Sequence, residues 1–365
     1  MDNWYRITNE DEVDSPALLI YPDRVKTNIN IAKNIVQDVA RLRPHVKTNK
    51  MREVAEMLLA AGVTKFKCAT IAEAEMLALA GAQDILLAYQ PNPVKASRLF
   101  TLIHNFPQVH FACLLDNIQT AEMLNNVFDT ANISVYIDLN VGMNRTGIKP
   151  ENALALYQYC QNLENIVTEG IHAYDGHLRD SEIAIRKQKT DAVYALVTQT
   201  KTKLEENSGK QLKLVMGGTP TFPLHAKRPD VETSPGTFVF WDEGYRTILP
   251  DLPFLIAGVL LVRVLSIIDE NTLCLDLGHK SVAAENPFPR VKFLNVAAVE
   301  AIGQSEEHLV VRVPNTANHP IGEVWYGVPY HICPTVALYD SVQVVENHQY
   351  IRDWKVVARD RALSC

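Results

Sequence analysis

The sequence lacks the features of a membrane, secreted or nucleic-acid-binding protein. Its most apolar run, PFLIAGVLLVRVLSII, is interrupted by Arg263 and is too short to cross a bilayer comfortably. The N-terminal segment, MDNWYRITNEDEVDSP, is acidic and polar, unlike a signal or transit peptide. The formal net charge is −7 and no basic run of useful length occurs, which argues against a nucleic-acid surface. Chemistry on a small molecule is therefore the better expectation.

Paired cysteine spacings, internal repeats, low-complexity segments and linkers are also absent from the sequence. The scattered cysteines favour a reducing cytoplasm over a disulfide framework; they are Cys68, Cys113, Cys160, Cys274, Cys333 and Cys365. With 365 residues, 47% of them hydrophobic and 21% charged, the chain has the composition of a soluble globular protein with one or two domains. We therefore expect a cytoplasmic protein.

Short apolar runs alternate with amphipathic helical stretches from about residue 40 to residue 245. One helix has a capping box at Thr70 and Glu73, and Gly81 stands where it should end. The candidate strands are ARLRPHV, KFKCAT, DILLAY, VHFACLL, SVYIDL, TEGIHAY, KLVMGG and TFVFWD. This alternation predicts an α/β fold, a (β/α)8 TIM barrel over residues 22–248, although a doubly wound sheet would alternate in the same way. In either fold, ligands bind at the C-terminal ends of the strands.

The pattern changes at about residue 252, where helical periodicity fades. Strand-like runs such as LLVRVLSII, TLCLDLG and HLVVRVP then alternate with turns. The early strand SPALLIY precedes the barrel pattern and is expected to pair with these strands. The sequence therefore predicts a β-rich second domain made of residues 1–21 and 249–365.

Lys47 ends the first predicted barrel strand, in the stretch RPHVKTNK. A lysine at this place can be partly desolvated, and desolvation favours the neutral, nucleophilic amine. A neutral amine forms a Schiff base with a carbonyl substrate or with pyridoxal phosphate. The alternative is an ordinary surface lysine at a strand end, and this stretch taken alone favours that alternative.

Two glycine turns late in the barrel pattern indicate a phosphate site. GGTPTF (217–222) directly follows the strand LKLVM and offers backbone N–H groups and hydroxyls. The turn SPGTF (234–238) is placed to supply further donors. A glycine pair is more often only a tight loop, so this interpretation needs support from the rest of the sequence.

Polar side chains follow two other predicted strands. Arg145 lies in DLNVGMNRTG between glycines that allow close backbone approach, and its permanent charge suits a ring oxygen or a carboxylate. A structural arginine bound to loop carbonyls is the alternative. YDGH adds the phenol of Tyr174 and the imidazole of His177.

The stretch PYHICPT contains a candidate metal pair. If it forms a strand, His331 and Cys333 are two residues apart and lie on the same face. Imidazole and thiolate suit zinc, but two protein ligands are fewer than the usual three of a catalytic zinc site. By spacing alone, this pair is more often incidental.

The stretches RPHVKTNK, DLNVGMNRTG, YDGH, GGTPTF, SPGTFVFWD and PYHICPTVALYD occur in one order over nearly the whole chain. This ordered set resembles the D-threonine aldolase and D-serine dehydratase family of pyridoxal phosphate enzymes, which are relatives of alanine racemase. The resemblance runs from about residue 15 to the C-terminus. It implies a barrel that holds the cofactor, a β domain and a homodimer.

The resemblance also implies roles for individual residues. Lys47 would form the Schiff base, and Arg145 would approach the ring oxygen of the cofactor, with Tyr174 beside it. His331 and Cys333 would bind a divalent metal, zinc or manganese, beside the cofactor. The phosphate would be held by Gly218, Thr219, Gly236 and Thr237.

Two positions depart from the family pattern, and at a third the aldolases and the dehydratases of the family differ. Asn49 stands where the family usually has histidine, and Ser234 stands where the racemases have an arginine for the pyridine nitrogen. Cys333 matches the dehydratases, whereas the aldolases have an aspartate at that position.

The resulting hypothesis is a metal-assisted lyase that acts on β-hydroxy D-amino acids. It would be D-threonine aldolase-like, or like a D-serine or 3-hydroxyaspartate dehydratase, and the sequence leaves both open. Lys47 would be the base for the α-proton, assisted by Tyr174 or His177. The alternatives are an amino-acid racemase, which needs no metal, and a non-catalytic pyridoxal-phosphate-binding protein.

Overall fold

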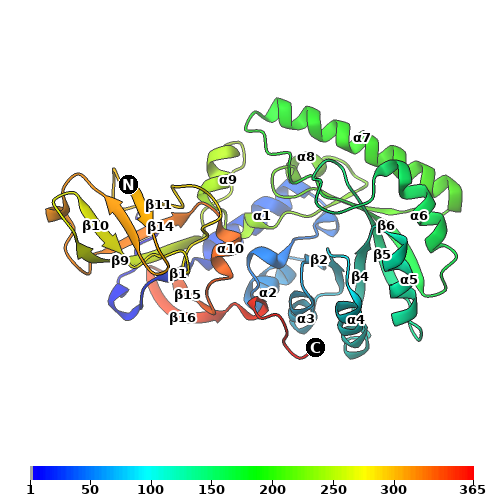
Figure 1. Ribbon diagram of the computed structural model, residues 1–365, viewed down its shortest axis with the longest axis horizontal. Coiled ribbons are helices and arrows are strands. Elements are labelled where there is room, and N and C mark those ends of the chain that lie inside the picture. The colour runs from blue at the N-terminus through cyan, green and yellow to red at the C-terminus, as the bar shows by residue number, and fades with distance from the viewer. Residues whose placement is uncertain (1–2) are drawn as a thin grey trace. The chain divides into compact units, whose positions relative to one another are not determined.

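The computed structural model describes residues 3–365, which form two compact units. The barrel unit comprises residues 32–47, 52–236 and 360–365. The sheet unit comprises the described residues up to 31, together with residues 48–51 and 237–359. Helix α1 (Pro22–Val36) contributes to both units. Figure 1 shows the helices and strands of the chain.

A curled sheet of parallel strands forms the centre of the barrel unit (Figure 1). In sheet order, which is also chain order, the strands are β2 (Lys65–Cys68), β3 (Asp84–Leu87), β4 (His110–Leu115), β5 (Ile133–Leu139), β6 (Ile166–Ala173), β7 (Lys213–Met216) and β8 (Val231–Thr233). The helices of this unit are α2 (Arg52–Ala60), α3 (Ile71–Ala80), α4 (Pro93–Asn105), α5 (Ile118–Val127), α6 (Ala153–Cys160), α7 (Ile183–Ser208) and α8 (Phe222–His225). The predicted α/β barrel architecture is confirmed.

The first predicted strand, ARLRPHV (40–46), lies between the edge strands β2 and β8 but forms only isolated bridges with them. We call it the bridging segment. Leu42 bridges to Thr233 of β8, and His45 bridges to Lys67 of β2, both in the parallel sense. Pro44 explains why no continuous ladder forms, because proline has no N–H to donate. Its carbonyl still accepts a hydrogen bond of 2.9 Å from the Lys67 N–H. The segment therefore occupies the position of an eighth strand without regular pairing.

The last predicted barrel strand, TFVFWD (237–242), is wrong. Its first residues form the 3-10 helix η5 (Thr237–Val239), and the residues from Phe238 to Trp241 are all buried. The apolar run thus reflected burial rather than extended backbone. The actual last strand is β8, whose sequence VET is short and polar and gave no strand signal.

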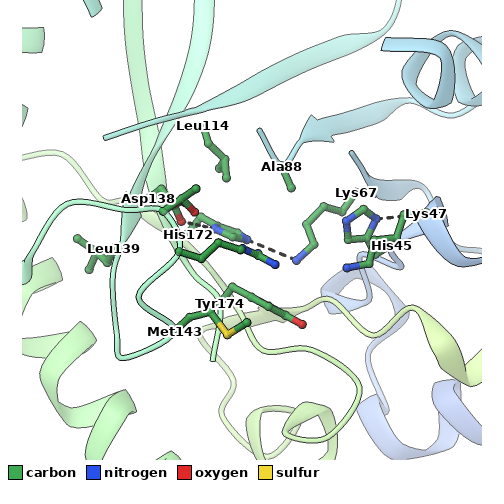
Figure 2. A pocket seen from close by; sticks show the side chains of 12 residues that line it. His45, Lys47, Lys67, Ala88, Leu114, Asp138, Leu139, Met143, His172 and Tyr174 are labelled. Carbon is green, nitrogen blue, oxygen red and sulfur yellow. Dashed lines mark hydrogen bonds and ion pairs between the residues drawn. The ribbon is translucent and has the colours of Figure 1, made fainter. Parts of the chain in front are cut away.

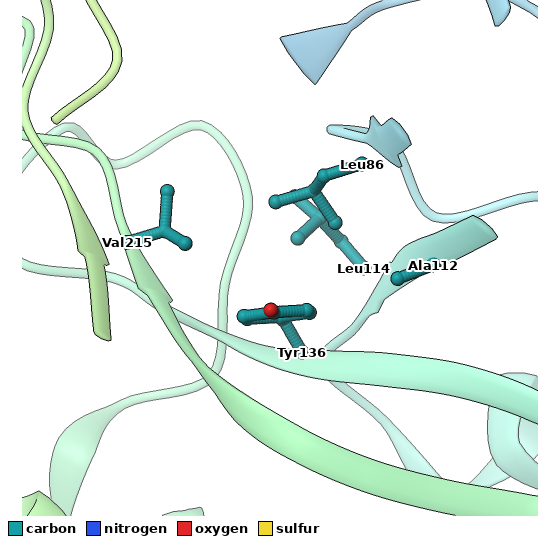
Figure 3. Close-up of a cluster of buried hydrophobic side chains, with 5 residues drawn as sticks. All are labelled: Leu86, Ala112, Leu114, Tyr136 and Val215. Carbon is teal, nitrogen blue, oxygen red and sulfur yellow. The ribbon is translucent and has the colours of Figure 1, made fainter. Parts of the chain in front are cut away.

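Alternate side chains of the strands fill the barrel interior in layers. The middle layer is an apolar cluster that includes Leu86, Leu114, Tyr136 and Val215 (Figure 3). A glycine at position 170 makes room for the Tyr136 ring, because a Cβ there would lie 2.7 Å from Tyr136 Cε1. This cluster separates two polar layers at the opposite ends of the strands.

The layer at the N-terminal ends of the strands is an ion-pair network around Arg43. The buried Arg43 guanidinium donates to both carboxylate oxygens of Asp84, at 2.6 and 3.1 Å, and to Glu232 Oε2 at 2.8 Å. Lys65 also pairs with Glu232, and His110 lies 3.5 Å from Asp84. Arg43 therefore fixes the bridging segment to β3 and β8.

The caps of α3 follow the sequence prediction. Thr70 Oγ1 accepts a hydrogen bond of 3.1 Å from the Glu73 N–H, and the Glu73 carboxylate accepts from the Ala69 N–H. Gly81 ends the helix with φ of 96°, a left-handed conformation that favours glycine. The predicted N-cap and C-terminal glycine are both confirmed, whereas the Glu73 carboxylate binds the N–H one residue before the N-cap instead of closing the capping box at Thr70.

A mostly antiparallel sheet forms the sheet unit, whose helices, besides part of α1, are α9 (Glu243–Ile248) and α10 (Ile332–Val336). The first strand, β1, pairs antiparallel with β9 and parallel with β15, so the expected pairing of SPALLIY with this domain is confirmed. The strands are β1 (Ala17–Ile20), β9 (Gly258–Ile267), β10 (Thr272–Leu275), β11 (Val291–Phe293), β12 (Glu300–Gln304), β13 (Leu309–Arg312), β14 (Val324–Pro329), β15 (Ser341–Glu346) and β16 (Gln349–Lys355).

The last residues of the chain return to the barrel unit. The Ser364 N–H donates to Glu75 Oε1 at 3.0 Å, and Arg98 Nε donates to the Cys365 carbonyl at 2.9 Å. These contacts bind the C-terminal segment to α3 and α4. Separately, none of the helices within residues 3–365 combines the length and the apolar character that a bilayer crossing requires.

Candidate active site

A polar pocket opens in the barrel unit where the strands have their C-terminal ends (Figure 2). Its lining residues come from the bridging segment, from the strands β2 to β6 and from the loops that follow them. Three of them are cations, namely Lys47, Lys67 and Arg145. The predicted location of the site at these strand ends therefore agrees with the structure, and the pocket suits an anionic ligand.

Lys47 reaches this pocket from the 3-10 helix η3 (Val46–Thr48), directly after the bridging segment. Its N–H donates to His45 Nδ1 at 3.3 Å, which fixes the backbone at this turn. The lysine side chain is half-buried. Lys47 thus lies in a polar pocket rather than on the open surface.

The Tyr174 ring lies among the three cations of the pocket. The Arg145 guanidinium carbon is 5.2 Å from the ring centroid, and the amines of Lys47 and Lys67 are 5.8 and 5.7 Å from it. Cations within about 6 Å of an aromatic face are attracted by its quadrupole. The Tyr174 ring thus attracts three basic side chains to the same part of the pocket.

Lys67, His172 and Asp138 form a hydrogen-bonded row in the pocket that the sequence analysis missed (Figure 2). Lys67 Nζ is 3.4 Å from His172 Nε2, and His172 Nδ1 is 2.7 Å from Asp138 Oδ1. Burial lowers the pKa of Lys67 to about 7, and the charge of Lys47 adds to this effect. Burial and the nearby Lys67 charge also lower the pKa of His172.

The two glycine turns meet in the barrel unit. The Gly236 N–H donates to Thr219 Oγ1 at 3.1 Å, and the Gly218 N–H donates to Thr221 Oγ1 at 3.3 Å. A Cβ on Gly218 would lie 2.8 Å from Tyr174 Cε2, so only glycine allows the backbone to pack this closely against the ring. Thr237, the fourth predicted phosphate residue, directly follows Gly236 in the chain.

Asp175 connects the YDGH stretch to the GGTPTF turn. Its buried carboxylate accepts from Thr221 Oγ1 at 2.7 Å and lies 2.8 Å from His225 Nε2. His225 in turn packs against Gly217, whose φ of 81° lies in the left-handed region. This network holds the turn in shape and supports the neighbouring Tyr174.

His177 does not line the pocket. A Cβ on Gly142 would lie 2.8 Å from His177 Nε2, which places the ring against the loop that carries Arg145. Its Nδ1 is buried and has no hydrogen-bond partner among the described residues. The predicted catalytic assistance by His177 stays a prediction.

His331 and Cys333 do come together, but not on a strand as expected. Strand β14 ends at Pro329, and His331 is the N-cap of helix α10, whose first turn accommodates Pro334. The His331 imidazole hydrogen bonds with Cys333 and with Glu285. The same-face strand argument is therefore wrong, although the pair forms at the helix start.

The contacts of Cys333 make its thiol more acidic. Burial would raise the pKa of this thiol, but the His331 hydrogen bond and charge outweigh it and lower the pKa. Its Sγ lies 3.1 Å from Thr48 Oγ1 and 3.5 Å from Thr237 Oγ1. Within residues 3–365, no group of three or more histidine, cysteine or acidic side chains is arranged to hold a metal.

Residues 20–243 match the family described as "Alanine racemase, N-terminal domain". The chain belongs to this family. Residues 257–345 match a second family, described as "Putative serine dehydratase domain". The alanine racemase match thus overlaps most of the predicted barrel region, and the dehydratase match overlaps most strands of the antiparallel sheet.

Relatives of this family member match it over nearly its full length. A D-threonine aldolase from Arthrobacter sp. is 28% identical over 359 residues, which are 95% of this chain and 93% of the relative. The D-threo-3-hydroxyaspartate dehydratase of Delftia sp. strain HT23 is 23% identical over 94% of this chain and 97% of the relative. The crystal structure of D-threonine aldolase from Filomicrobium marinum superimposes with a TM-score of 0.85 at 25% identity, covering 95% of this chain and 96% of that one.

Proposed function

We propose that this chain is a pyridoxal-phosphate-dependent, metal-assisted lyase that acts on β-hydroxy D-amino acids. The observation that carries the proposal is Lys47, which shares one pocket with Arg145 and Tyr174 in a chain similar over 95% of its length to a D-threonine aldolase. Aldol cleavage and dehydration are both represented among the relatives. The reaction is therefore one of these two.

The barrel unit fits pyridoxal phosphate on its own chemistry. The cofactor is anionic, and the pocket has three cations around an aromatic ring. Gly218 packs directly against that ring, where a Cβ would not fit, so the backbone of the GGTPTF turn lies next to a side chain of the pocket. In the second turn, the buried Ser234 hydroxyl has no hydrogen-bond partner among the described residues, so it is available to a ligand.

Bound pyridoxal phosphate supplies an electron sink for the electrons released at the substrate Cα. Lys47 would hold the cofactor through its amine and, once the substrate amine replaces it, would in dehydration take the α-proton at Nζ. Arg145 would orient the anionic ring oxygen, and Tyr174 would support the ring. Gly218, Thr219, Gly236 and Thr237 would bind the phosphate.

His331 and Cys333 would hold a divalent metal, zinc or manganese. An imidazole and a thiol of lowered pKa are a donor set that suits zinc. The metal would act as a Lewis acid on the substrate β-hydroxyl. Two protein ligands leave further coordination positions for water and substrate.

The test is a product assay with D-threonine, D-serine and D-threo-3-hydroxyaspartate, with pyridoxal phosphate and either Zn²⁺ or Mn²⁺ added. Glycine and acetaldehyde from D-threonine identify an aldolase, whereas an oxo acid and ammonia identify a dehydratase. Chelation of the metal should abolish either activity. Racemisation that persists after chelation, or cofactor binding without any product, would overturn the proposal.

Assembly and compartment are further parts of this proposal. We expect a homodimer, as in the family that the sequence resembles, and light scattering of the purified chain tests it. All six cysteines lie within residues 3–365 and none of them forms a disulfide there, which fits the proposed cytoplasmic location.

A further inference from the structure

Lys67 occupies an unusual position for a lysine. It is 1% exposed on β2, in an interior layer where barrels normally place apolar side chains. Among the described residues, no carboxylate lies within 4 Å of its amine, and its hydrogen-bond partner is a histidine nitrogen. A buried charge without a paired carboxylate is costly, so a purely structural role would be served better by an apolar residue.

The contacts of Asp138 determine how the row is protonated. Its carboxylate accepts from Gln90 Nε2 at 2.9 Å and Thr146 Oγ1 at 3.0 Å, in addition to the His172 contact. Burial would raise the pKa of Asp138, but these hydrogen bonds, led by that of His172, lower it. Since an ionised carboxylate only accepts, His172 carries its hydrogen on Nδ1 and leaves Nε2 as the acceptor for Lys67.

The resulting order is that of an oriented acid–base unit. A carboxylate orients an imidazole, and the imidazole accepts a hydrogen bond from the group that faces the ligand. In this pocket that group is an amine. The contact with His172 uses one hydrogen of Lys67 Nζ, so the other positions on the nitrogen remain for a ligand in the pocket.

We propose that Lys67 is a second acid–base group of this pocket, oriented by His172 and Asp138 as positioning residues, which exchanges a proton with the ligand that Lys47 holds. This inference rests on the proposed function. The ammonium form of Lys67 gives one proton from Nζ to a ligand atom and becomes neutral. It regains one proton from a ligand atom or from water in a later step.

The electrostatic surroundings allow Lys67 to change its charge. Its lowered pKa, about 7, makes both forms available near neutral pH, where acid–base catalysis is most effective. Besides burial, the charges of Lys47 and Arg43 lower it, and those of Asp138 and Asp175 raise it. The proposed lyase reactions move protons at more than one atom, and Lys47 alone would have to serve them all.

The first experiment needs no cofactor. In the full chain labelled with ¹³C at lysine Cε, NMR titration should show one lysine that ionises near pH 7 and is lost in Lys67→Met. Lys47→Met should raise that pKa because a neighbouring positive charge is removed, and Asp138→Asn should lower it because a negative charge is removed. Lys65→Met, on the same strand two residues earlier, is the control and should leave this titration unchanged.

The second experiment uses the loaded enzyme. Lys67→Met should retain the visible absorbance of the bound cofactor and lose about 10²–10⁴-fold in kcat, the usual contribution of one acid–base group. Asp138→Asn should move the matching limb of the kcat–pH profile to lower pH. These readouts separate proton exchange from a structural role, which would leave the profile in place.

Two results would overturn the inference. One is a lysine resonance, assigned by Lys67→Met, that titrates near the ordinary value of about 10. The other is a loaded Lys67→Met enzyme with wild-type kcat. If wild-type chain forms no product with any of the substrates, the proposed function fails instead, and the NMR titration still reports the state of Lys67 separately.

Discussion

Replacing Arg43 by methionine should destabilise the barrel unit strongly. The Arg43 guanidinium is buried and holds two carboxylates, those of Asp84 and Glu232, at the N-terminal ends of the strands. Methionine fills a similar length but leaves both acids without this partner. Because the same guanidinium fixes the bridging segment that leads to Lys47, the substitution also tests what holds the candidate site in place.

The size of the expected loss in the free energy of unfolding follows from the burial of the ion pairs of Arg43. Removing one partner of a buried ion pair typically costs about 3–5 kcal/mol of the free energy of unfolding. Lys65 still pairs with Glu232, and His110 still lies near Asp84, so the lower end of that range applies. A loss of about 3 kcal/mol corresponds to a fall in Tm of about 6–12 °C at about 2–4 °C per kcal/mol.

Urea unfolding followed by circular dichroism measures this loss, with Arg52→Met as the matched control. Arg52 pairs with Glu56 at 2.7 Å on the helix surface, where both side chains are about half exposed, so its loss should change the free energy of unfolding by less than about 0.5 kcal/mol. A change for Arg43→Met as small as that for Arg52→Met would refute the reasoning.

The stability lost in Arg43→Met should also depend on pH, and it should become smaller as the pH falls. Burial would raise the pKa of Asp84, but the contacts with His110 and Arg43 outweigh this and hold it far below its ordinary value. A carboxylate with a depressed pKa contributes stability above its unfolded pKa, about 3.9, and loses it as the pH falls further. The difference between wild type and Arg43→Met should therefore be full at neutral pH and shrink below about pH 4.

Three further predictions concern the cofactor site and the pH dependence of stability. In the chain loaded with pyridoxal phosphate, Lys47→Ala should abolish the visible absorbance and the borohydride-stable label that mass spectrometry locates at this residue; an unchanged spectrum contradicts the assignment. Gly218→Ala should weaken cofactor binding about tenfold, since the new Cβ meets the Tyr174 ring and overpacking of about 1.4 kcal/mol is typical, and an unchanged Kd by fluorescence titration would show that the ring moves aside. Contacts with Asp84 and Glu169 raise the pKa of His110 to about 9, so its stabilising effect is complete below about pH 6.5 and lost as the pH rises through 9. Urea midpoints of wild type should thus fall over this interval relative to His110→Gln, and parallel curves would exclude this ion pair as a source of stability.

Local patterns in the sequence predicted much of the fold. The helix from Ile71 to Ala80 depends on a cap, an apolar sequence that is buried almost throughout and a terminal glycine, all within one short segment. The buried parallel strands follow similarly from their apolar runs. The first and last predicted strands were less accurate because Pro44 interrupts one ladder, and because burial made the residues after Gly236 as apolar as a strand.

The candidate site was only partly predictable, since its chemistry depends on register between strands. Lys47, Arg145 and Tyr174 each lie at or after the end of a predicted strand and were found from that position. Lys67 lies inside KFKCAT, where nothing local distinguishes it from a solvated lysine. Its role becomes visible only when Asp138 and His172 are paired in register across β5 and β6 and lie beside it.

Both units are assembled from distant parts of the chain, and this has a consequence for synthesis on the ribosome. Strand β1 finds its partners in β9 and β15, and Glu75 of the barrel unit binds Ser364. Contacts between residues so far apart in the sequence form slowly during folding. Neither unit can complete its native contacts before β15 and the segment around Ser364 have been synthesised, so deletion of the segment around Ser364 should disturb the barrel unit as well.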